Sequence, residues 1–195
     1  MKKLHSRKII LPLFFVLLAV LLVADRFTKV VATDALGGGG AIPFIPGFLD
    51  FVLVHNVGAA FGLMEGAQPF FLALALAASL GIIIFMAFTR QQTLLVTAAF
   101  AFVCAGAAGN GIDRAISGRV TDFIHTLFID FPVFNVADSC ITVGVILLLI
   151  ALLFGNGTLF SRLDARDDEA ALEQTPEPVT ADESSLDKTA QGTER

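Results

Sequence analysis

The stretch that decides the fold is residues 133–154, which read VFNVADSCITVGVILLLIALLF. It is long enough to cross a hydrocarbon layer about 30 Å thick, which takes roughly 20 helical residues. Asn135 and Asp138 lie near its start, and their i, i+3 spacing places them on one face of a helix. These residues therefore predict a transmembrane helix that carries a polar pair at one end.

Three further stretches are similarly apolar, and the composition of the chain agrees with them. Its 195 residues are 55% hydrophobic and only 16% charged, with a mean hydropathy of +0.78. This composition indicates a membrane protein, and it excludes a disordered chain, a disulfide scaffold and a nucleic-acid-binding protein with a basic surface. We expect a mainly α membrane protein built as a four-transmembrane-helix bundle. The expected spans are residues 9–29, 69–88, 93–111 and 133–154.

The first span also has features of a cleavable signal peptide, because several lysines and arginines precede its apolar run. The small residue at the end of that run is Ala24, but Leu22 stands where a second small residue is needed for cleavage. The sequence therefore favours a first span that is retained.

Lysines and arginines in the loops predict the orientation of the spans. They precede the first span, occur at Arg90 between the second and third spans, and follow the fourth span, whereas none lies between Val30 and Thr89. Both termini are therefore expected to be cytoplasmic, and residues 30–68 and 112–132 to be extracytoplasmic.

Two segments outside the spans have a distinct character. Within residues 30–68, glycines and prolines precede a β-branched and aromatic run at 48–55, which predicts a short strand near the membrane surface. Residues 155–195 contain 10 of the 18 acidic residues but only 4 of the 13 basic ones, and we expect them to form an acidic, disordered cytoplasmic tail. Residues 1–154 are nearly neutral and are expected to form one integral membrane domain.

Several polar or ionisable side chains lie within the apolar spans or at their edges. An ionisable group near the bilayer centre costs about 2.5–3.5 kcal/mol on insertion scales, so such residues are retained when they pair, line water or carry function. They gather toward the extracytoplasmic ends of the first, third and fourth spans, which predicts a common polar site there. These residues are Asp25, Lys29, Asn56, Asn110, Asp113, Arg114, Asp122, Asn135 and Asp138.

Asp122 and Asp138 are the pair with the clearest chemical use. Asp122 lies in the expected loop before the fourth span, and the turn can return it toward Asp138 at the start of that span. Two carboxylates about 4 Å apart repel by roughly 4 kcal/mol at an effective dielectric near 20, which separates their titrations by about three pK units. One proton is then shared near neutral pH, so that one carboxylate deprotonates a water while the other protonates a carbonyl. This is the chemistry of aspartyl peptide hydrolysis, which needs no metal or other cofactor.

The same residues allow other interpretations. Asp113 and Arg114 are adjacent and suit a structural ion pair, and Asp25 with Lys29 suits an anchoring pair at a helix end. The asparagines suit hydrogen bonds between helices. A proton-coupled membrane carrier could use the same carboxylates as a relay, although a polar cluster at one membrane face and the lack of an internal repeat argue against it. No metal site is expected, because the histidines lack further donors at ligand spacing.

Five short blocks follow one another along the chain. They are DRFTK at 25–29, HNVGAAFG at 55–62, GNGIDR at 109–114, VTDF at 120–123 and FNVAD at 134–138. In order and spacing they resemble the signature blocks of bacterial lipoprotein signal peptidase, also called signal peptidase II or prolipoprotein signal peptidase. The resemblance covers roughly residues 9–154, and five blocks in order are far more specific than any one of them.

The resemblance implies an intramembrane aspartyl endopeptidase that removes the signal peptide from diacylglyceryl-modified prolipoproteins, cleaving just before the lipidated cysteine. It implies a bacterial cytoplasmic (inner) membrane protein with its active site near the extracytoplasmic face. It also implies a small extracytoplasmic β-structured cradle, which matches the segment 41–62. We expect prolipoprotein substrates and membrane lipid as partners, no nucleic acid, and function as a monomer.

In that family the catalytic aspartates belong to the last two blocks, which implies Asp122 and Asp138 as the catalytic pair of this chain. Arg26 stands where the family often has Gln, and His55 stands where it often has Tyr; neither departure touches the implied pair. The remaining polar positions would support the site or bind substrate. They are Asp25, Lys29, Asn56, Asn110, Asp113, Arg114 and Asn135.

Overall fold

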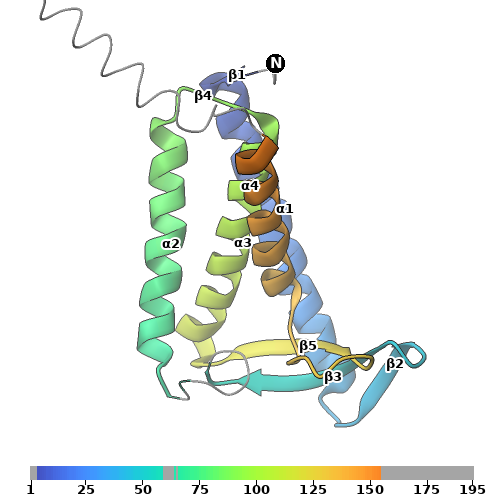
Figure 1. Cartoon of the computed structure of the whole chain (residues 1–195). Coiled ribbons are helices and arrows are strands. Elements are labelled where there is room, and N and C mark those ends of the chain that lie inside the picture. The colour runs from blue at the N-terminus through green and yellow to red at the C-terminus, as the bar shows by residue number, and fades with distance from the viewer. Residues whose placement is uncertain (1–3, 59–63, 65, 155–195) are drawn as a thin grey trace, which may run out of the picture. The chain divides into compact units, whose positions relative to one another are not determined.

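The computed structural model describes residues 4–58, 64 and 66–154. The expected acidic tail and residues 59–62 of the expected cradle lie outside the described residues. Within the described part, four helices are long and apolar enough to cross a membrane, and they confirm the mainly α, four-helix fold (Figure 1). They are α1 (Arg7–Leu36), α2 (Gln68–Phe88), α3 (Leu94–Ser117) and α4 (Val136–Phe154).

Helices α1 and α3 extend further than the apolar runs predicted. Helix α1 continues to Leu36 because no glycine or proline occurs between Lys29 and Gly37, which is its C-cap residue. Helix α3 continues past residue 111 to Ser117 and ends at Gly118, whose left-handed φ of 68° lets its N–H donate to the Arg114 carbonyl at 3.0 Å. Both helices thus continue beyond the expected ends of their apolar spans at 29 and 111, because polar residues near a helix end do not stop the helix.

Helix α3 lies between α2 on one side and α1 and α4 on the other (Figure 1). Glycines on α3 and α4 allow the close approach of these two helices. A Cβ atom at Gly144 would lie 2.8 Å from the Val103 backbone nitrogen and 2.9 Å from the Ala99 carbonyl oxygen, closer than real contacts allow. The α3–α4 contact, which positions the first turn of α4, therefore depends on small residues.

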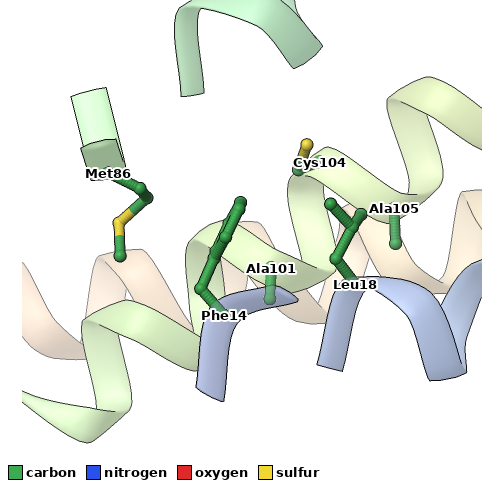
Figure 2. Packing of buried hydrophobic residues seen from close by; sticks show 6 residues of the cluster. All are labelled: Phe14, Leu18, Met86, Ala101, Cys104 and Ala105. Carbon is green, nitrogen blue, oxygen red and sulfur yellow. The ribbon is translucent and has the colours of Figure 1, made fainter. Parts of the chain in front are cut away.

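A hydrophobic core joins α1, α2 and α3 away from the polar site. Figure 2 shows Phe14 and Leu18 of α1 beside Ala101 and Ala105 of α3, with Met86 reaching in from α2. Phe14 and Met86 are fully buried. This packing holds the three helices together at a distance from the ionisable residues.

A three-stranded antiparallel sheet lies at the end of the bundle where α1 ends and α4 begins (Figure 1). Its strands are β2 (Ala41–Ile45), β3 (Leu49–Asn56) and β5 (Val120–Thr126), in the order β2-β3-β5. The expected strand at 48–55 is therefore present as β3.

Strand β5 was not expected, because residues 112–132 were predicted to form a loop. It pairs with β3 so that Val54 lies opposite Asp122. The sheet packs on the end of α1 through Phe123, which joins Ala32 and Leu36 in a buried cluster. Pairing with β3 and this packing on α1 stabilise β5 as a strand, and neither contact can be seen in the local sequence.

At the opposite end of the bundle, β1 (His5–Ser6) pairs with β4 (Gln91–Gln92) (Figure 1). The Arg7 N–H donates to the Arg90 carbonyl at 2.8 Å beside this pairing. The start of α1 is thereby attached to the turn between α2 and α3.

Candidate active site

Asp122 and Asp138 line one cavity of about 740 Å³. Asp122 comes from β5 and Asp138 from the first turn of α4. The cavity walls are largely apolar and are formed by α2, α3 and α4, for example by Phe71, Val103 and Ile141. Two acidic side chains are therefore positioned at the polar end of an otherwise hydrophobic cavity.

Asp122 is almost completely buried, with 2% of its surface exposed. Its Oδ1 accepts a hydrogen bond from Asn135 Nδ2 at 2.6 Å, and its Oδ2 accepts one from Asn56 Nδ2 at 3.0 Å. Burial, followed by the nearby charge of Asp138, raises the pKa of Asp122 from 3.8 to about 6, although both amide donors oppose that shift. Asp122 therefore keeps its proton to a higher pH than an ordinary aspartate does.

Asp138 is held by the N-terminus of α4. Its Oδ2 accepts from the Asn135 backbone N–H at 3.1 Å, while Asn135 Oδ1 accepts from the Asp138 backbone N–H at 3.0 Å. This reciprocal arrangement is a capping box. The other oxygen, Oδ1, accepts from Asn110 Nδ2 at 2.7 Å. The backbone N–H at the start of the helix and the Asn110 amide thus hold this carboxyl group by both of its oxygens.

The fully buried Asn135 side chain links the two aspartates. Its Nδ2 donates to Asp122 Oδ1 and also, at 3.1 Å, to Asn110 Oδ1. Because its own Oδ1 caps α4 next to Asp138, one asparagine contacts both halves of the pair. The spacing of Asn135 and Asp138 predicted that they share a face, but not this connection to Asp122.

An ionic cluster lies behind the two aspartates and joins α1 to α3. Lys29 Nζ lies 2.9 Å from Asp25 Oδ2 and 2.9 Å from Asp113 Oδ2, and its side chain is only 3% exposed. Asp25 Oδ1 also accepts from the Ala137 N–H at 3.0 Å, next to Asp138. Removing one member of such a buried cluster is strongly destabilising, because it leaves an uncompensated charge. The expected anchoring role of Asp25 and Lys29 agrees with these contacts.

The expected ion pair between Asp113 and Arg114 was wrong. Adjacent side chains on a helix point in different directions, and Asp113 pairs with Lys29 and Arg26 instead. Arg114 donates to the Gly58 carbonyl at 3.3 Å and to the Asn110 carbonyl at 3.4 Å. Its guanidinium also lies 5.1 Å from the centre of the Phe71 ring, a cation–π contact.

All nine polar residues singled out in the sequence belong to this connected group. Four of them, Asn56, Asn110, Arg114 and Asn135, contact the aspartates or shape the cavity wall, and Asp25, Lys29 and Asp113 form the cluster behind it. Sequence reasoning missed Arg26 as the second partner of Asp113, although a charged residue within an apolar span needs a partner. It also missed Phe71, which is one of 19 phenylalanines and has no distinguishing signal. In the described part of the chain, no group of three or more His, Cys, Asp or Glu residues could hold a metal ion.

Four apolar helices with two carboxyl groups facing an apolar cavity define a multi-pass membrane protein with a buried acidic site. Residues 17–154 match the family model described as signal peptidase (SPase) II. The chain belongs to the signal peptidase II family, and it is therefore a membrane-embedded protease. This membership gives no support to the alternative of a proton-coupled carrier.

Two similar proteins and one solved structure agree with this assignment. The lipoprotein signal peptidase of Brevibacillus brevis is 38% identical over 137 residues, which cover 70% of this chain and 92% of that protein. The lipoprotein signal peptidase of Enterococcus faecalis is 38% identical over 144 residues, which cover 74% and 89% of the two chains. A bacterial membrane enzyme solved by the in meso method at 2.3 Å resolution superposes with a TM-score of 0.71 at 34% identity, covering 80% of this chain and 94% of that one.

Proposed function

We propose that this protease is an aspartyl endopeptidase in which Asp122 and Asp138 together activate one water molecule and polarise the peptide bond. The observation that carries the proposal is that both carboxyl groups line one cavity and are linked through Asn135. In the proposed step, ionised Asp138 takes a proton from the water, and protonated Asp122 donates its proton to the carbonyl oxygen of the peptide. The pKa of Asp122 near 6 supports this division of roles.

The reaction of the family is the removal of signal peptides from prolipoproteins. We propose that the substrates of this chain carry a diacylglyceryl group and are cut just before the lipidated cysteine. Acyl chains hold such a substrate in the bilayer with about 0.8 kcal/mol per buried CH₂ group. The largely apolar cavity beside the two carboxyl groups suits a peptide that is presented from lipid rather than from water.

The proposed supporting residues act in two groups. Asn56, Asn110 and Asn135 orient the two carboxyl groups by donating amide hydrogens to them. Asp25, Lys29, Asp113 and Arg114 hold α1, α3 and the sheet in the positions that this geometry needs. Lys29 forms ion pairs with Asp25 and Asp113. Asp25 accepts a hydrogen bond from the Ala137 N–H, and Arg114 donates one to the Gly58 carbonyl.

We further propose a bacterial cytoplasmic membrane location, with both termini cytoplasmic and the active site near the extracytoplasmic face. Arg7 and Arg90 meet at the end of the bundle away from the sheet, which by the positive-inside rule is the cytoplasmic end. Residues 1–154 would then be the peptidase domain and residues 155–195 a cytoplasmic tail. The catalytic pair and its supporting residues come from this single chain, which supports function as a monomer.

The test compares two versions of one precursor peptide, with and without a diacylglyceryl group on the cysteine. The purified chain in detergent or lipid is incubated with each peptide, and the products are identified by mass spectrometry. We expect cleavage of the diacylated peptide alone, at the bond that precedes the cysteine. Equal cleavage of both peptides would contradict the lipid requirement, whereas pH-gradient-driven flux in proteoliposomes without any cleavage would contradict the protease itself.

A further inference from the structure

The Asn110 side chain has two different ends, and the structure gives each end a different partner. Its Nδ2 donates to Asp138 Oδ1 at 2.7 Å, while its Oδ1 accepts from Lys29 Nζ at 3.2 Å and from Asn135 Nδ2 at 3.1 Å. A flip of the amide by 180° would turn its oxygen toward the Asp138 carboxylate and its NH₂ group toward two donors. The orientation of Asn110 therefore decides whether Asp138 receives a hydrogen bond or faces another acceptor.

Lys29 is, with Asp138 and the Nδ2 group of Asn135, one of the partners of Asn110 that suit only the present orientation. An ammonium group has three donors and no acceptor. In this site its three neighbours are all acceptors, namely Asp25 Oδ2, Asp113 Oδ2 and Asn110 Oδ1. Because Lys29 is almost completely buried, a flipped Asn110 would leave one of its donors without a protein partner and would set an NH₂ group against the ammonium group.

We propose that Lys29 is a positioning residue for the reaction: through its contact with Asn110 it fixes the amide that donates to Asp138. Lys29 does not line the cavity of Asp122 and Asp138, so the proposed role needs no contact between Lys29 and the substrate. This inference rests on the proposed function, since it assigns a purpose to the hydrogen bond received by Asp138. A positioning role differs from a purely anchoring role in one respect: loss of Lys29 should lower turnover only while the Asn110 amide is present.

Three single variants separate positioning from anchoring. Lys29→Gln introduces a side chain with both a donor and an acceptor, which no longer dictates the orientation of Asn110. We expect its kcat to fall about ten- to a hundredfold, the range for losing one hydrogen bond to a charged group, with KM changed by less than about threefold. Lys29→Arg keeps a donor-only group and is expected to retain kcat within about threefold.

The matched control is Arg26→Gln. Arg26 pairs with the same Asp113 but does not contact Asn110, and 41% of its side chain is exposed. The Arg26→Gln substitution removes an ion pair from the same cluster. We therefore expect this variant to have lower thermal stability and a kcat within about threefold of the parent. An equal loss of kcat in Arg26→Gln and Lys29→Gln would indicate that only the integrity of the cluster matters, which overturns the proposal.

A double-mutant cycle tests the route through Asn110. If Lys29 acts through this amide, Lys29→Gln causes little further loss of kcat once Asn110→Leu is present. If the two residues act independently, their fold losses multiply, and this result overturns the proposal. If Lys29→Gln does not fold, the same cycle is measured in a protein that also carries Asp25→Asn. The second substitution restores the net charge of the cluster, and the Asp25→Asn single variant then serves as the reference.

The outcome also distinguishes this inference from the proposed function. Full turnover in Lys29→Gln, together with inactive Asp122→Asn and Asp138→Asn variants, overturns the positioning role and leaves the aspartyl mechanism in place. Turnover in the aspartate variants overturns the mechanism itself.

Discussion

Asn135 and Asp138 each accept a hydrogen bond from the backbone N–H of the other, at 3.0 and 3.1 Å, in the first turn of α4. The proposed catalytic carboxyl group is therefore part of the structure that starts the helix. The Nδ2 group of the same Asn135 contacts Asp122 and Asn110. Helix capping and the alignment of the two aspartates consequently depend on one side chain.

Replacing Asn135 by Ser separates these two roles. Serine can still accept from the Asp138 N–H and cap α4, but it lacks the amide that donates to Asp122 and Asn110. We expect Asn135→Ser and Asn135→Ala to lose turnover similarly, by about ten- to a hundredfold. The Ala variant should unfold at a lower temperature, because loss of the cap costs about 1 kcal/mol. Thermal unfolding and peptide cleavage measure both quantities, and a fully active Ser variant would disprove the bridging role.

The pKa of Asp122 predicts how activity depends on pH. If protonated Asp122 is the acid, kcat/KM falls as the pH rises through about 6, because the shared proton is lost. The measurement is a pH–rate profile for cleavage of the diacylated peptide. A profile that rises through the same range would instead make Asp122 the base and exchange the roles of the two aspartates.

The same pKa predicts a change in stability with pH. The folded-state pKa of Asp122 lies above its ordinary value of 3.8, so between about pH 4 and pH 6 the folded chain binds more protons than the unfolded chain. The free energy of unfolding that Asp122 contributes is fully present below about pH 4. It is lost as the pH rises through about 6, and the total loss is about 3 kcal/mol. The parent should thus lose stability relative to Asp122→Asn between pH 4 and pH 7, as measured by thermal unfolding. A stability difference that is constant across this range would contradict the assignment.

Close packing of α3 against α4 predicts that Gly144 cannot be enlarged. A Cβ atom there would meet Val103 and Ala99 backbone atoms, so Gly144→Ala should lower stability by about 1–3 kcal/mol and reduce turnover by shifting α4. The matched control is Gly81→Ala in α2, where nothing lies within 4 Å of the added atom. This variant is expected to be neutral or slightly more stable. Equal thermal midpoints for the two variants would show that this contact has no influence on the fold.

The four spans could be predicted because each apolar run is long enough to cross a bilayer on its own. The common polar site could be predicted as well, since charged groups such as Lys29 are too costly in lipid to remain unpaired. The partner of each charged side chain could not be predicted. Asp113 pairs with Lys29 and Arg26 of another helix rather than with its sequence neighbour Arg114, because helix geometry and tertiary packing decide which side chains meet.

Strand β5 escaped prediction for a related reason. Val120–Thr126 is stabilised as a strand by pairing with β3 and by the packing of Phe123 on the end of α1. Neither partner is visible in the local sequence. The strand matters for the site because it carries Asp122 and sets its position opposite Val54.

Asp122 and Asp138 are proposed to act together on one water molecule. The most direct measurement is cleavage of the diacylated precursor peptide by Asp122→Asn and Asp138→Asn, beside Asp130→Asn, an exposed aspartate that does not line the cavity. Insertion and thermal unfolding of each variant are checked first. We expect folded, membrane-inserted Asp122→Asn and Asp138→Asn proteins without measurable turnover, and an Asp130→Asn protein with parental activity. Retained turnover in either cavity variant would contradict the claim.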